Sequence, residues 1–181
     1  MAKLISKTYG DALFGLAVEE DKIDVRLEEI EQLQNILAQN EDFGKLMNHP
    51  KIIKEEKIQV AENVFKGRIS KELLGFLTII ISKDRYKEID EILAYFIAEG
   101  KKYKGIGVAT VTTAVPLRED QCRKIEQKLL ETTEYKSMEM HYKQDASLIG
   151  GMVIRIGDRV VDSSISTKLN ELQKELLKVQ I

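Results

Sequence analysis

The chain has 181 residues, of which 43% are hydrophobic and 32% charged, and its formal net charge is −2. This composition is typical of a folded globular protein, and the near-neutral charge disfavours a nucleic-acid binder or a protein steered to an anionic membrane. The single cysteine, Cys122, excludes an internal disulfide and a CxxC redox pair, and it makes a zinc site improbable.

The first hundred residues predict a helical bundle, because apolar residues recur there at spacings of three and four. The predicted helices cover about 4–17, 25–37, 43–47, 52–65, 72–81 and 86–103. Ser70 is expected to cap the fifth helix, since its hydroxyl can accept a hydrogen bond from a free N–H of the first turn. This fifth helix is apolar nearly all the way round, so it lies either at the centre of the bundle or between the core and a partner.

The stretch 19–42 is the most unevenly charged, with nine acids against Lys22 and Arg26. It is either a solvated helix face or a surface for a basic partner.

The pattern changes near residue 105. Alternating β-branched residues over 108–115 predict a strand that Pro116 ends. Further elements are predicted as a helix from about 118, a strand over 137–143, a hairpin of 152–156 with 159–162, and a helix over about 166–179. The expected fold is therefore α+β and mainly α: a six-helix bundle over 1–105, then a small β-hairpin or sheet plus helices over 106–181.

Motifs for catalysis or cofactor binding are few. Gly44-Lys45 and Gly100-Lys101 lack the glycine five residues earlier that a phosphate-binding loop needs. His49 and His141 stand far apart without a histidine partner, and Cys122 has no convincing base nearby. We therefore expect no catalytic residue, no cofactor and no metal. We also expect no signal peptide and no membrane-spanning segment.

The segment Ser147–Asp162, SLIGGMVIRIGDRVVD, is the most specific in the chain. A glycine pair permits a bend there, a hairpin follows, and a leucine-striped helix comes next. This segment resembles the C-terminal signature of the delta subunit of bacterial rotary ATP synthases. The same family includes the mitochondrial oligomycin sensitivity conferral protein.

Three other segments resemble this family in order and spacing, so the resemblance spans essentially the whole chain. Tyr9–Phe14 is similar to the family's opening pattern, with Gly10 in place of the usual alanine. Phe76-Leu77 with Arg85 is similar to its fifth helix, although Lys83 stands where asparagine is common. Gly107–Leu117 is similar to the strand that leaves the helical domain. Asp162-Ser163-Ser164 departs from the family, which often has a glycine after the aspartate.

The resemblance implies a non-catalytic stator subunit of the rotary, proton-translocating ATP synthase. Such a subunit links the catalytic head to the peripheral stalk, so that rotation is coupled to ATP synthesis. The helical domain 1–105 would bind N-terminal segments of alpha subunits, and the α+β domain 106–181 would contact subunit b. The protein would be peripheral, at the cytoplasmic face of the bacterial plasma membrane, with no membrane insertion and no nucleic acid.

In the family, the first and fifth helices form the groove for the alpha segment. The candidates for that groove here are Tyr9, Ala12, Leu13, Leu16, Leu73, Leu77 and Ile80, each of which could instead belong to the bundle core. Leu169, Leu172 and Leu176 would contact the stalk or pack on their own small sheet. Two functional alternatives remain: a helical adaptor or regulatory module unrelated to ATP synthase, and a small-molecule enzyme.

Overall fold

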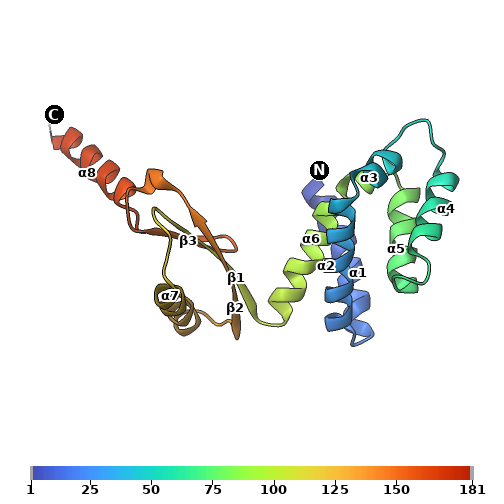
Figure 1. Cartoon of the computed structure of the whole chain (residues 1–181), viewed down its shortest axis with the longest axis horizontal. Helices are drawn as coiled ribbons and strands as arrows, with labels where there is room; N and C mark the ends of the chain where they lie inside the picture. Colours follow the sequence, from blue (N-terminus) through green and yellow to red (C-terminus); the bar gives the residue numbers. More distant parts are fainter. Residues whose placement is uncertain (1, 180–181) are drawn as a thin grey trace. The chain divides into compact units, whose positions relative to one another are not determined.

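The computed structural model describes residues 2–179 and divides into two compact units, the first ending at Gly100 and the second beginning at Lys101. Six α-helices and a short 3-10 helix build the first unit (Figure 1). They are α1 (Ala2–Glu19), α2 (Ile23–Gln39), α3 (Glu41–Met47), α4 (Lys54–Phe65), α5 (Lys71–Ser82), η1 (Tyr86–Glu88) and α6 (Ile89–Tyr103), which continues into the second unit. All six predicted helices are confirmed.

The core of the helical unit takes apolar side chains from every helix. α5 contributes the most side chains, because it buries Leu73, Phe76, Leu77, Ile80 and Ile81. Aromatic rings join its other parts, with Phe43 packed edge-on against Phe65 at 5.5 Å and against Tyr86 at 6.0 Å between ring centroids. The interior is therefore continuous from α1 to α6.

Ser70 begins α5 as predicted. Its hydroxyl accepts a hydrogen bond from the backbone N–H of Leu73 at 3.3 Å. The side chain thus satisfies one of the N–H groups that a helix leaves free in its first turn.

A four-stranded sheet, two α-helices and a short 3-10 helix form the described part of the second unit (Figure 1). Its elements are β1 (Ile106–Thr113), α7 (Glu119–Thr132), β2 (Ser137–Gln144), η2 (Ala146–Leu148), β3 (Met152–Ile156), β4 (Arg159–Asp162) and α8 (Ile165–Val179). The strand order is β2-β1-β3-β4. β1 and β2 are parallel, and α7 connects them, because parallel neighbours need a crossover. The predicted α+β, mainly α fold is confirmed.

β1 begins two residues before the predicted strand. Ile106 and Gly107 already pair with Ser137 and Met138 of β2. Glycine has no side chain to mark an alternating pattern, so the start of this strand was hidden in the sequence. Gly107, Ala109, Val111 and Thr113 all point to the buried side.

Candidate functional site

The structure places the seven predicted groove residues in two different environments. Leu13, Leu73, Leu77 and Ile80 lie in the core of the helical unit. Tyr9 is half-buried, and Ala12 and Leu16 are exposed, with 38% of Leu16 accessible. Four of the seven side chains therefore serve the bundle, and any partner on this face would meet mainly the other three.

Tyr9 marks where the two predicted helices meet. Its ring packs edge-on against Phe76 of α5, with centroids 6.5 Å apart and planes at 72°. Leu16 lies seven residues beyond Tyr9, almost two helical turns, and so faces the same side of α1. The exposed side of α1 next to α5 is thus apolar.

Ile79 is a surface residue that the sequence analysis missed. It is 51% exposed, although Ile80 and Ile81 beside it are buried. It lies three residues after Phe76, so the two share one face of α5. Gly75 adds open space there, since nothing lies within 4 Å of the position that a Cβ would take. The only signal in the sequence was that α5 is apolar on every side.

Arg26 of α2 holds the first turn of α5. Its buried guanidinium donates hydrogen bonds to Glu72 at 2.7 Å, to Glu29 at 2.9 Å and to the Ser70 hydroxyl. Burial by itself lowers the pKa of Arg26, but the hydrogen bonds that it donates to Glu72 and Glu29, together with their negative charges, outweigh burial and raise the pKa. The hydrogen bond from Arg26 lowers the pKa of Glu72. This cluster fixes the N-terminal end of α5, and with it the direction of the outward residues.

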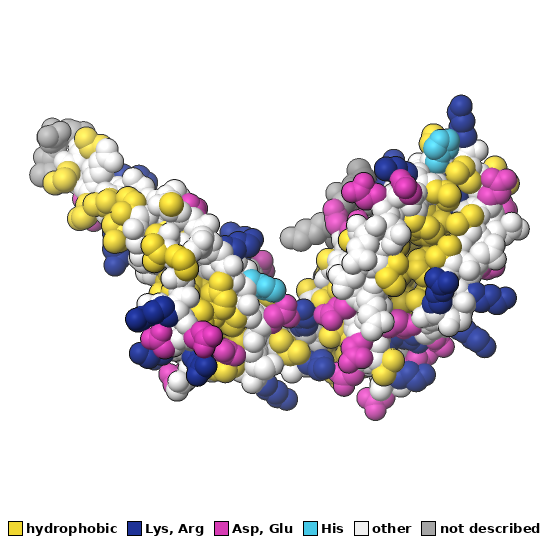
Figure 2. All heavy atoms as spheres, viewed as in Figure 1, with side chains coloured by type: hydrophobic (Ala, Val, Ile, Leu, Met, Phe, Trp, Pro, Cys, Tyr) yellow, Lys and Arg dark blue, Asp and Glu magenta, His cyan; other side chains and the backbone are white. Residues whose placement is uncertain are grey.

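The leucines of α8 are exposed along the helix. Leu169, Leu172 and Leu176 are 52%, 56% and 70% accessible, and Figure 2 shows hydrophobic side chains gathered along this helix. The alternative that they pack on the small sheet is therefore wrong. α8 contacts η2 at its first turn instead, where a Cβ on Gly150 would meet Ile165. Farther along the described part of the helix, the leucines stay more than half exposed.

The first turn of α8 is held by polar side chains. Asp162 accepts hydrogen bonds from the backbone N–H of Ser164 at 2.8 Å and from the Thr167 hydroxyl at 2.8 Å. The hydrogen bond from the Ser164 backbone is the main reason why the pKa of Asp162 is lowered. Ser163 and Ser164 thus start a helix although the family's glycine is absent.

Residues with possible chemistry are scattered. Cys122 lies half-buried in α7, and its backbone oxygen accepts a hydrogen bond from the Tyr142 hydroxyl at 3.4 Å. His141 lies on β2 beside Glu139, 3.0 Å away, and His49 accepts a hydrogen bond from the backbone N–H of Lys51. Among residues 2–179, no three His, Cys, Asp or Glu side chains come together in a way that could hold a metal ion.

No helix within residues 2–179 is both long enough and apolar enough to span a bilayer.

The comparisons with known proteins agree with each other. The sequence model of a family described as ATP synthase delta (OSCP) subunit matches residues 5–176. The chain is 54% identical to an ATP synthase subunit delta of Lachnoclostridium phytofermentans over the whole of both chains, and 32% identical to one of Alkaliphilus oremlandii, also over the whole of both. Its fold is similar to a chain in the Toxoplasma gondii mitochondrial ATP synthase hexamer, with a TM-score of 0.79, 20% identity, and 95% and 97% of the two chains covered.

Proposed function

The chain belongs to the ATP synthase delta (OSCP) subunit family and is a structural subunit of an ATP synthase, and we propose that it joins the catalytic head to the peripheral stalk without any catalysis of its own. The joint keeps the head from turning with the rotor, so that rotation is coupled to ATP synthesis. The observation that carries this proposal is that the family match includes both units of the chain. The alternative of an unrelated adaptor is not favoured.

The proposed head contact lies on the outward side of α1 and α5. An amphipathic helix from the N-terminus of an alpha subunit would lay its apolar face against Tyr9, Leu16 and Ile79. Ala12 and Gly75 carry little or no side chain and leave room for its backbone. In this arrangement Leu13, Leu73, Leu77 and Ile80 support the surface from the core.

Calorimetric titration of the full chain with a synthetic N-terminal peptide of the same organism's alpha subunit tests this contact. We expect one-to-one binding that Leu16→Asp and Ile79→Asp each weaken about tenfold or more, since each places a charge in an apolar contact. Val25→Asp on α2 is the matched control, because Val25 is also exposed but lies on another helix. Unchanged affinity in both of the first two variants would contradict the proposed surface.

The salt dependence of the same titration gives a second test. An apolar contact is screened far less than surface ion pairs, so the affinity should change by less than about threefold between low and high salt. A collapse of affinity in high salt would indicate an electrostatic contact instead.

The proposed stalk contact lies on α8. Ile165, Leu169, Leu172 and Leu176 follow each other at steps of four, three and four, which is the spacing of a coiled-coil seam. We expect a soluble C-terminal fragment of subunit b to cosediment with the full chain, and Leu172→Asp with Leu176→Asp to abolish this. Leu177→Asp is the control, because Leu177 is just as exposed but lies off the seam. Equal loss in the control would remove the argument for a seam.

The proposal places the protein at the cytoplasmic face of the bacterial plasma membrane, held there through other subunits. Membranes from cells that lack those subunits should therefore not retain it. Retention on such membranes would indicate a direct lipid contact.

A further inference from the structure

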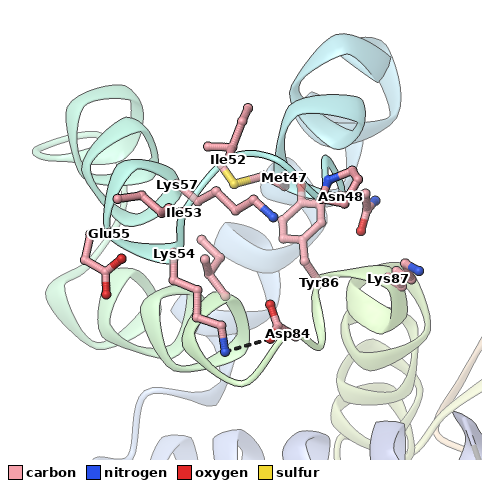
Figure 3. Close-up of a pocket in the computed structure, with 12 residues that line it drawn as sticks. Met47, Asn48, Ile52, Ile53, Lys54, Glu55, Lys57, Asp84, Tyr86 and Lys87 are labelled. Carbon is pink, nitrogen blue, oxygen red and sulfur yellow. Dashed lines mark ion pairs between the residues drawn. The ribbon is translucent and has the colours of Figure 1, made fainter.

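A pocket of about 590 Å³ lies in the helical unit, apart from the surfaces proposed above. Figure 3 shows it between the end of α3, the start of α4, and the segment that follows α5. Met47, Ile81 and Tyr86 give it a buried apolar wall. The volume lies in the range of sites for small molecules.

Lys57 of α4 is the buried cation of this pocket. Only 7% of the residue is exposed, and its side chain extends across the pocket towards Tyr86 (Figure 3). Within residues 2–179, its ammonium makes no hydrogen bond or ion pair. An ammonium on a mostly buried side chain has lost part of its hydration, and a hydrogen-bonded anion would compensate that loss. Lys57 can therefore form an ion pair with an anion that enters the pocket from the solvent.

The acids that line the pocket form no ion pair with Lys57 among the described residues, although the hydrogen bond from Lys54 and, to a lesser extent, the charge of Lys57 lower the pKa of Asp84. Asp84 forms an ion pair with Lys54 at 2.6 Å, and Figure 3 shows Glu55 directed away from the Lys57 ammonium. The N-terminal end of α4 also lies at this pocket, and Ile53 provides no side-chain cap for it. Free N–H groups and the positive end of the helix dipole thus add to the attraction for an anion.

We propose that this pocket binds a small amphipathic carboxylate. Its carboxylate pairs with the Lys57 ammonium, and its alkyl or aryl body lies against Met47, Ile81 and Tyr86. A neutral molecule of the same shape lacks the ion pair, and a small hydrophilic anion lacks the apolar contact. Binding therefore requires both the carboxylate and the apolar body of the ligand.

Titration of the isotope-labelled full chain with octanoate, followed by NMR, tests the proposal. We expect saturable shifts of the Met47 methyl group and of amides at the start of α4. Octan-1-ol and acetate are the matched probes, and each should bind at least about tenfold more weakly, because a charge-assisted hydrogen bond or the apolar burial is lost.

Lys57→Met should weaken octanoate binding about tenfold or more, whereas Lys57→Arg, which keeps the charge, should retain most of it. Lys87→Met is the control, because it removes the same charge from an exposed lysine of the same pocket. Equal octanoate affinity in Lys57→Met and the unaltered chain overturns the proposal, and so does the absence of saturation at millimolar octanoate. If Lys57→Met does not fold, equal affinity for octanol and octanoate in the unaltered chain overturns it as well.

Discussion

The ring of Tyr95 on α6 occupies the space that a methyl group on Gly10 of α1 would need. The ring is held there by its hydroxyl, which donates a hydrogen bond to Asp11 at 2.8 Å. This hydrogen bond is the main reason why the pKa of Tyr95 rises to about 12. The glycine that replaces the family's usual alanine therefore matches a large aromatic side chain on the facing helix.

Gly10→Ala should lower the free energy of unfolding by about 1–2 kcal/mol, because the overlap with Tyr95 costs more than the better helix propensity of alanine gains. Urea denaturation of the full chain measures this. In a Tyr95→Ala background the same change should instead stabilise by about 1 kcal/mol. An equal effect in both backgrounds would mean that the two side chains do not compete for space.

Arg26→Met should lower the free energy of unfolding by about 2–3 kcal/mol, since it leaves Glu29 and Glu72 without their buried partner. Chemical denaturation followed by circular dichroism is the measurement. Lys45→Met provides the control, because Lys45 pairs with Asp42 on an exposed surface and should contribute less than about 0.5 kcal/mol. Similar losses in the two variants would argue that burial of the Arg26 cluster adds nothing.

The pH dependence of stability should report on Glu72. Its pKa lies below the ordinary value of 4.5 in the folded chain, because Arg26 holds it charged. Such a carboxylate stabilises fully above the unfolded pKa, and this contribution is lost as the pH falls through the folded pKa. Stability should therefore fall below about pH 4.5, and less steeply in Glu72→Gln.

Urea denaturation from pH 7 down to about pH 3 measures both slopes. In an Arg26→Met background, Glu72→Gln should change the slope much less. Parallel curves for the unaltered chain and Glu72→Gln would contradict this interaction.

Ile149→Gly should stabilise the second unit by about 0.5–1 kcal/mol. Ile149 has φ +65°, which a β-branched residue adopts only under strain, and its side chain is 63% exposed, so its removal loses little burial. Thermal denaturation of the full chain shows the sign. Val161→Gly, at the same exposure but in the extended strand β4, should destabilise instead. A loss of stability in Ile149→Gly would mean that its side chain makes contacts that outweigh the strain.

The sequence by itself determined which segments are helices and strands and to which family the chain belongs. The period of apolar residues predicted all six helices of the first unit, because each helix buries one face and repeats it every three to four residues. Ser70 predicted the start of α5 through local capping chemistry, which requires no distant partner. The segment 147–162 carried the family resemblance, because its glycines and hairpin are local features.

The candidate surfaces depended on what packs against each face. The sequence does not distinguish Ile79 from Ile80 and Ile81, yet of these three residues only Ile79 is exposed. Lys57 follows Ile53 by four residues, but nothing in the sequence showed that its side chain would be mostly buried and would line a pocket. The leucines of α8 formed a stripe, but only the tertiary structure showed that Leu169, Leu172 and Leu176 are exposed. Periodicity fixes the directions of the side chains around one helix relative to each other. The positions of the neighbouring helices and strands decide which of these side chains face the core.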